Sequence, residues 1–378
     1  MKRLILLFAA VLLAGCAATR PAVVPPELFA DHLFAPPRQQ LGVEEIFALT
    51  PQMKRYARQI YQRRGGEEPR RALFNALYRR EALQLDYDSA RTRTAAEAFA
   101  ARQGNCLSLV IMTAALAREI DVPVVLQEVP GNAAWSRSGS LYLNSGHVNL
   151  QLGRAGVTWE APGDYLLIDF LPPVEGRRSL ARPITRTAVA AMFMNNRAAE
   201  ALADGDVDEA YWWARNAIVT APALTHAYNT LAVVHRRHGD TARAEATLRH
   251  ALRAAPDDIA ALANLVRLLE DEGRAADAAA PRSRLAALQP DVPFHFYDLG
   301  QRAMAAGDYA AARRLFEREL RRDPDYHAFH FAAAQAALAL GDMAGASRHL
   351  QRANATSGTA SQRDLYTAKL DRLRAPLH

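Results

Sequence analysis

Three residues in the first half of the chain have the types and the order of a catalytic cysteine set. They are Cys106, His147 and Asp169. In such a set a thiolate attacks a carbonyl carbon, an imidazole pairs with the thiolate and later protonates the leaving group, and a carboxylate on the other ring nitrogen fixes the tautomer. The set predicts amide chemistry through a thioester on Cys106, with the backbone N–H of Cys106 helping to bind the oxyanion.

The cysteine is expected at the start of a helix. Asn105 is a favourable N-cap residue, and the apolar run from Cys106 to about Ile120 ends before Pro123. The macrodipole and the free N–H groups of a helix N-terminus favour a thiolate over a thiol. We therefore predict a reactive thiol at this position, with an inert buried thiol as the alternative.

The histidine and the aspartate are expected on two strands. The stretch from residue 145 onward alternates, which predicts a strand with His147 and Asn149 on one face and apolar residues on the other. Residues 166–170 predict a later strand that carries Asp169. Because the connection between the two strands is longer than a tight hairpin needs, Asp164, in a Pro-Gly turn, remains a second candidate for the carboxylate.

The segments around these residues resemble the transglutaminase-like superfamily. The resemblance lies in Gln103-Gly104-Asn105-Cys106-Leu107-Ser108-Leu109, Gly146-His147-Val148-Asn149-Leu150 and Leu167-Ile168-Asp169-Phe170. It covers about residues 45–188 and implies a papain-like α+β fold, in which Cys106 is the nucleophile, His147 the base and acid, and Asp169 the group that orients the histidine. It implies no metal and no organic cofactor. Bacterial members are often proteases, which favours hydrolysis, but acyl transfer to an amine stays open.

The second half of the chain repeats with a period of 34 residues. Proline, glycine and alanine each recur in one register: Pro222, Pro256, Pro290 and Pro324; Gly205, Gly239, Gly273, Gly307 and Gly341; Ala210, Ala244, Ala278, Ala312 and Ala346. The pattern resembles a tetratricopeptide repeat array. It predicts helical hairpins with glycine in the turn between the two helices and proline after the second helix.

The resemblance implies an all-α solenoid that follows the α+β domain. Five repeats are expected over residues 191–224, 225–258, 259–292, 293–326 and 327–358, and then a capping helix and tail over 359–378. Such arrays bind partners, so we expect a protein or peptide on the concave face, with a rigid spacer or dimer surface as the alternative. The pairs His235/His238 and His327/His330 are expected on solvated helix faces rather than at a metal, because no third ligand is near.

The N-terminus has the pattern of an export signal. Residues 1–15 combine a positive start with an apolar run, and Leu13-Ala14-Gly15-Cys16 resembles a bacterial lipobox. The resemblance implies cleavage before Cys16, lipidation of its thiol and a membrane anchor in the bacterial envelope. Ala17 favours the outer membrane, facing the periplasm. An ordinary signal peptide or short anchor is the alternative, and residues 16–44 are expected to form a proline-rich tether.

Composition excludes several classes of protein. The chain contains two cysteines, Cys16 and Cys106, so it holds neither a disulfide framework nor a four-cysteine zinc site. The net charge is +6 and the arginines are spread along the chain, so the sequence predicts no clustered basic surface for nucleic-acid binding. Two hypotheses remain: an envelope lipoprotein with a cysteine amidase or protease domain whose repeats recruit a partner, or a non-catalytic scaffold with a residual or inactive domain of that kind. A peptidoglycan-linked amidase is a third and weaker one.

Overall fold

The structure is a computed structural model of the 378-residue chain. It describes residues 24–78, 83, 85–88, 91–138, 141–154, 156, 164–170, 181–288, 294–357 and 360–374. The predicted signal peptide 1–15 and the predicted lipidation site Cys16 lie outside these residues. In the described part, no helix is both long enough and apolar enough to cross a membrane.

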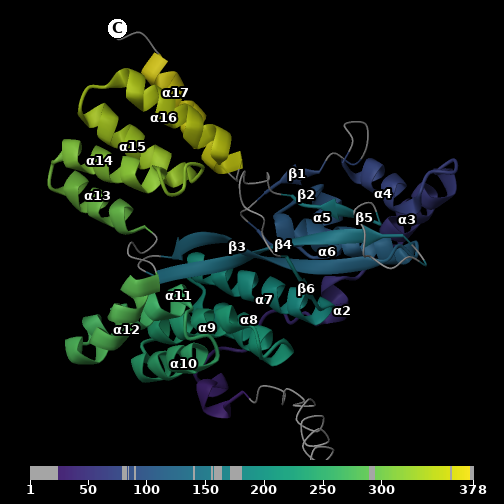
Figure 1. The fold of residues 1–378 in the computed structure, drawn as a ribbon, viewed down its shortest axis with the longest axis horizontal. Coiled ribbons are helices and arrows are strands. Elements are labelled where there is room, and N and C mark those ends of the chain that lie inside the picture. The colour runs from purple at the N-terminus through teal and green to yellow at the C-terminus, as the bar shows by residue number, and fades with distance from the viewer. Residues whose placement is uncertain are drawn as a thin grey trace, which may run out of the picture.

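An N-terminal region that mixes helices and strands is followed by a helical array (Figure 1). The elements of the first region are η1 (Pro26–Leu28), η2 (Asp31–Leu33), α2 (Val43–Ile46), α3 (Pro51–Arg63), α4 (Pro69–Tyr78), β1 (Asp86–Tyr87), α5 (Ala95–Ala101), β2 (Gln103–Gly104), α6 (Cys106–Glu119), β3 (Val124–Ser138), β4 (Leu141–Gly153), β5 (Tyr165–Ile168) and β6 (Arg182–Ile184). Those of the array are α7 (Arg186–Ala203), α8 (Val207–Thr220), α9 (Thr225–His238), α10 (Thr241–Ala254), α11 (Ile259–Asp271), α12 (Ala275–Leu288), α13 (His295–Ala305), α14 (Tyr309–Leu320), α15 (His327–Ala339), α16 (Met343–Thr356) and α17 (Ala360–Arg374).

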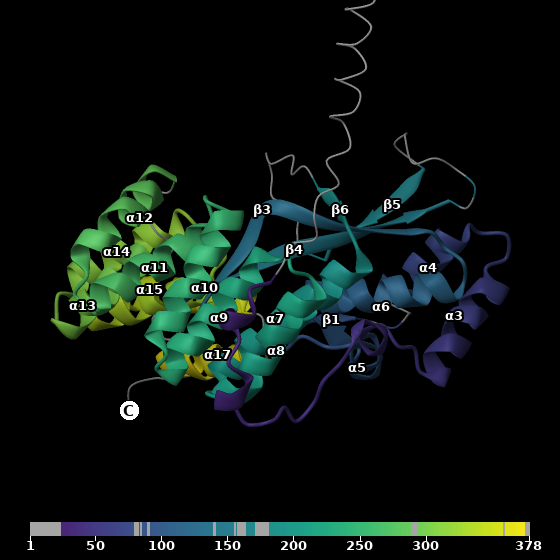
Figure 2. The same ribbon diagram turned by 90° about the horizontal axis from the view of Figure 1, so that it is seen from below.

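The main sheet of the described residues is small and antiparallel, with strand order β5-β4-β3-β6. Val148, Leu150 and Leu152 of β4 are completely buried, as the alternating pattern predicts for the apolar face of a strand. Helices α6 and α7 both pack against β3 and β4 (Figure 2). Helix α6 is buried along nearly its whole length, which explains its continuous apolar sequence.

Local sequence explains the repeated helix pairs. From α7 to α16, the described residues form five pairs, and the glycine between the two helices of each pair has a positive φ, between 73° and 95°. Only glycine adopts this conformation without strain, so the prediction that glycine makes these turns is confirmed. In four pairs the next residue is an aspartate whose side chain accepts a hydrogen bond from the first turn of the second helix: Asp206, Asp240, Asp308 and Asp342.

The array curves around one end of the sheet. The first helices of the first three pairs, α7, α9 and α11, contact β4, while α8, α10 and α12 lie on the side away from it (Figure 1). One continuous core joins Leu107 to Ile120, the apolar face of β4, and the first helix pairs as far as Ala278. The first repeats and the sheet are therefore packed as one body.

The segment expected to be a tether is packed against the array over the part that the structure describes. We call residues 24–38 the N-terminal strap. The Phe34 ring stacks on the Tyr211 ring at 3.9 Å between centroids, and the Trp212 indole N–H donates to the Ala35 carbonyl at 2.6 Å. The prolines of this segment predict a semi-extended tether, and the structure adds that its apolar side chains find buried sites on α8 and α9.

Two of the array histidines are buried, contrary to the expectation of solvated faces. His235 contacts the strap, with its Nε2 2.9 Å from the Leu28 carbonyl oxygen. Burial lowers the pKa of His235 to about 4, although the hydrogen bond to Leu28 acts in the other direction. His330 packs against His349, with 3.1 Å between their Nδ1 atoms. The sequence spacing could not reveal these contacts, because the partners come from other elements.

Replacement of Phe34 by alanine tests the packed strap. Phe34 is 6% exposed, so Phe34→Ala should lower the free energy of unfolding by about 3 kcal/mol, measured by urea titration. Its neighbour Leu33 is 40% exposed, and Leu33→Ala should cost less than about 1 kcal/mol. Equal and small effects of both changes would mean that the strap is free of the array.

Candidate active site

Cys106 is the first residue of helix α6 and is half-buried. The prediction that Asn105 caps this helix is confirmed, because its side chain accepts a hydrogen bond from the Ser108 N–H at 2.9 Å. The approach to the cysteine is tight: a Cβ on Gly104 would lie 2.7 Å from the Cβ of Ser108. A glycine two residues before the cysteine is therefore required by the backbone that places the thiol.

The imidazole of His147 contacts the predicted carboxylate. His147, on β4, is 2% exposed, and its Nε2 lies 2.8 Å and 3.0 Å from the two carboxylate oxygens of Asp169. Asp169 directly follows β5, and β5 pairs with β4 in the sheet, with Leu150 opposite Ile168. The long connection between the two residues is therefore no obstacle, because β5 returns to the edge of β4. Of the two carboxylates that the sequence offered, Asp169 and Asp164, the first is the one on the imidazole.

Asn149 is a further member of this cluster. Its side-chain N–H donates to Asp169 at 3.2 Å, so the carboxylate is held by the amide as well as by the imidazole. Asn149 is buried, and it shares the strand face of His147. The alternation of the sequence placed Asn149 on that face but could not show which group it meets.

The thiol of Cys106 also affects the His147 imidazole. Burial of His147 opposes the imidazolium, but the hydrogen bond with Asp169 and the charges of Asp169 and Cys106 outweigh it and raise the pKa of His147 to about 9. A thiol, an imidazole and a carboxylate are the groups that nucleophilic catalysis by cysteine uses.

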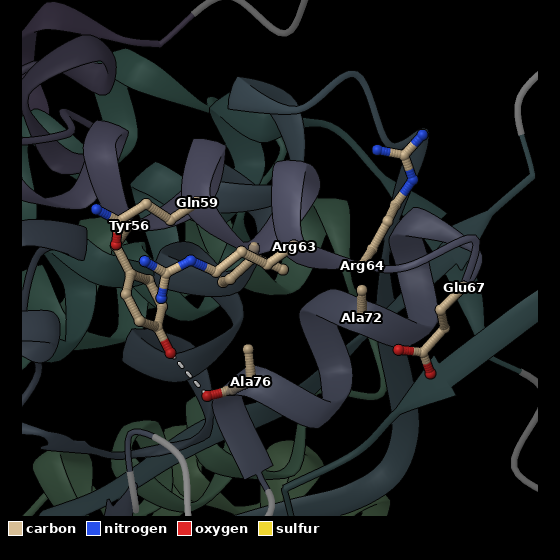
Figure 3. Close-up of a pocket in the computed structure, with 8 residues that line it drawn as sticks. Tyr56, Gln59, Arg63, Arg64, Glu67, Ala72 and Ala76 are labelled. Atoms are coloured by element: carbon tan, nitrogen blue, oxygen red, sulfur yellow. Dashed lines mark hydrogen bonds between the residues drawn. The ribbon is translucent and has the colours of Figure 1, made fainter.

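A shallow pocket elsewhere in the N-terminal region does not belong to this site. It lies between α3 and α4, has a volume of about 290 Å³, and is lined by residues that include Tyr56, Arg63 and Glu67 (Figure 3). The Tyr56 hydroxyl donates to the Ala76 carbonyl at 2.7 Å across one side of it. Neither Cys106, His147 nor Asp169 lines this pocket. Within the described ranges, no group of three or more His, Cys, Asp or Glu side chains is arranged to hold a metal ion.

Comparison with protein-family models identifies the helical array. Two models described as tetratricopeptide repeat match residues 225–268 and 297–359. The C-terminal half carries tetratricopeptide repeats. Arrays of this kind bind protein or peptide partners. Both matches lie after the candidate active site, so the chemistry proposed for Cys106 rests on the geometry described above.

Solved structures are similar to about half of this chain at low identity. A structure titled as the functional characterization of Pseudomonas aeruginosa pilF has 19% identity and a TM-score of 0.31, over 50% of this chain and 86% of that one. A thermophilic tetratricopeptide protein of Thermus thermophilus has 16% identity and a TM-score of 0.34, over 48% and 98%. At these scores, neither structure informs on function. No curated protein matches the chain.

The repeat helices that face the sheet are not open to a partner along their whole length. The strand β4 contacts α7, α9 and α11, so the inner side of the first three pairs is occupied by the protein itself. The expectation of a ligand along the concave face therefore needs a correction for these pairs. Where β4 contacts these three helices, a partner would have to displace the strand.

An NMR titration of His147 tests the ion-pair geometry. The imidazole should titrate near pH 9, and Asp169→Asn should lower this pKa because a hydrogen bond and a charge that favour the imidazolium are lost. Asp164→Asn is the matched control and should leave it unchanged. A pKa equal in the wild type and in Asp169→Asn would contradict the contact.

The same shift predicts how stability depends on pH. Because the native pKa of His147, about 9, lies above its ordinary value of 6.5, the protonated ring stabilises the fold. This contribution is complete below pH 6.5 and is lost as the pH rises through 9. In urea titrations, the free energy of unfolding of the wild type should therefore exceed that of His147→Ala by more at pH 6 than at pH 9. A difference between the two proteins that does not change with pH would contradict the raised pKa.

Proposed function

We propose that the N-terminal region is a cysteine-dependent amidase of the transglutaminase-like, papain-like kind, and that the repeats recruit its protein or peptide partner. The observation that carries the proposal is the contact between the His147 imidazole and the Asp169 carboxylate, with Cys106, at the N-terminus of α6, contributing to the raised pKa of that imidazole. A buried histidine held by a carboxylate next to a thiol at a helix N-terminus is an arrangement with a specific chemical use.

The residues act in a defined sequence. The Cys106 sulfur attacks the amide carbon and forms a C–S bond, and the electrons of the carbonyl move to the oxygen. The N–H of Cys106, in the first turn of α6, has no partner within the helix and can donate to this oxyanion. The C–N bond then breaks as His147 delivers its proton to the leaving nitrogen, while Asp169 keeps the ring in place.

The thioester is then transferred to an acceptor. When His147 takes a proton from water, the hydroxide attacks the thioester and the products are a carboxylic acid and the thiol, which is hydrolysis. When it takes a proton from an amine, the product is a new amide, which is acyl transfer. Hydrolysis is the proposed outcome on the family resemblance, and both use the same residues.

The location follows from the N-terminal motif. The lipobox-like Leu13-Ala14-Gly15-Cys16 supports a lipid anchor on Cys16, and Ala17 supports the outer membrane, facing the periplasm. In this proposal the strap leads from the anchor to the first repeats, so the enzyme and the array stay at the membrane surface together. Cys106 is then the remaining free thiol.

Alkylation of Cys106 tests the enzymatic proposal. In protein starting after Cys16, iodoacetamide should modify Cys106 at pH 6 at least about tenfold faster than it modifies a free thiol, whose pKa is about 8.5. His147→Ala should abolish this acceleration, and Cys106→Ser is the control for labelling elsewhere. Mass spectrometry of the labelled peptide gives the rate.

The result also decides between the two hypotheses. If Cys106 is alkylated no faster than a free thiol, or equally fast in His147→Ala, the enzymatic proposal is overturned. It would favour the alternative, a non-catalytic repeat scaffold with a residual domain.

A further inference from the structure

A side-chain pair on the first repeat helix contacts the segment just upstream of the candidate nucleophile. Glu200 of α7 accepts a hydrogen bond from the backbone N–H of Thr92 at 2.6 Å. Arg197, one turn earlier on the same helix, donates to the Thr92 carbonyl oxygen at 3.4 Å and lies 3.6 Å from Glu200. Both backbone groups of one residue of the N-terminal region are thus held by the array.

Thr92 in turn holds the cap of the nucleophile helix. Its hydroxyl oxygen accepts a hydrogen bond from the side-chain N–H of Asn105 at 2.8 Å, and Thr92 and Asn105 are both buried. The Asn105 oxygen accepts from the N–H and from the hydroxyl of Ser108, at 2.9 Å and 2.8 Å. This fixes the first turn of α6, the turn that begins with Cys106.

The hydrogen bonds of Asn105 and Ser108 each have a defined donor and acceptor. The Asn105 amide uses its oxygen for the helix and its nitrogen for Thr92, so both ends of the side chain are engaged and the amide cannot rotate without losing a bond. Ser108 accepts from the Arg93 N–H at 2.7 Å, which ties the residue after Thr92 to the same turn. Displacement of Thr92 would remove one of the two anchors of the Asn105 side chain.

We propose that Glu200 and Arg197 of the repeat array are positioning residues for Cys106, acting through Thr92 and Asn105. The inference rests on the proposed function, and it deepens it: the first repeat is part of the machinery that aims the thiol, in addition to any partner that the array binds. When the cap is weakened, the first turn of α6 frays and its N–H groups no longer align at the helix N-terminus, where Cys106 lies. A partner that moves α7 would change the reactivity of the thiol by the same route.

The test compares alkylation of Cys106 in three variants that start after Cys16. Glu200→Ala, which removes the acceptor for Thr92, should lower the rate at pH 6 about fivefold, the effect of losing one well-placed hydrogen bond. Glu200→Gln keeps an acceptor oxygen and should restore most of the rate. Glu44→Ala is the matched control, because Glu44 also pairs with α7, through Arg186 at 2.7 Å, but does not contact Thr92.

A second measurement reads the cap itself. Hydrogen exchange of the amides in residues 106–109 should speed up in Glu200→Ala and not in Glu44→Ala. Thr92→Val, which keeps the shape of the side chain but loses the acceptor for Asn105, should give the same two effects as Glu200→Ala. If Glu200→Ala does not fold, Thr92→Val replaces it in both measurements.

The outcomes separate the two proposals. A normal alkylation rate in folded Glu200→Ala and Thr92→Val would overturn the positioning role while leaving the enzymatic proposal intact. If Cys106 of the wild type is alkylated no faster than Cys106 of His147→Ala, the enzymatic proposal is overturned, and this inference with it. The second failure is a property of the unaltered protein, so it cannot be confused with the first.

Discussion

The burial of one face of strand β4 constrains much of this structure. Val148, Leu150 and Leu152 have no exposed surface and lie in a core that also contains α6 and the first repeat helices. Because side chains alternate along a strand, burying these three places His147 and Asn149 on the opposite face. A register slip of one residue would turn His147 toward the apolar core and away from Asp169 and Cys106.

The same strand joins two regions that differ in sequence character. Strand β4 pairs with β5 along one edge, which brings Asp169 to His147. It also contacts α7, α9 and α11 of the array. The strap adds a second attachment on α8 and α9, where Phe34 stacks on Tyr211. The repeats are therefore both an array that can bind a partner and a structural support for the region that carries the thiol, the imidazole and the carboxylate.

Electrostatics at the candidate active site follow from this packing. A buried imidazole is normally neutral, because burial disfavours its charged form. At His147 the carboxylate and the thiol reverse that preference and raise the pKa to about 9. At His235, with only a carbonyl as partner, burial prevails and the pKa falls to about 4. Two buried histidines of one chain thus differ in charge at neutral pH because of what each ring nitrogen meets.

The sequence by itself determined the local features: the glycine turns and aspartate caps of the repeats, the Asn105 cap, and the strand faces of β4. Each depends on residues within a few positions of one another, where backbone conformation and periodicity suffice. Only the tertiary structure decided that the strap packs on the array, that Asn149 reaches Asp169, that β4 occupies the inner side of the first repeats, and that Glu200 holds Thr92. Those contacts join residues about 20 to 180 positions apart, and no local pattern encodes which distant side chain will complete a buried hydrogen bond.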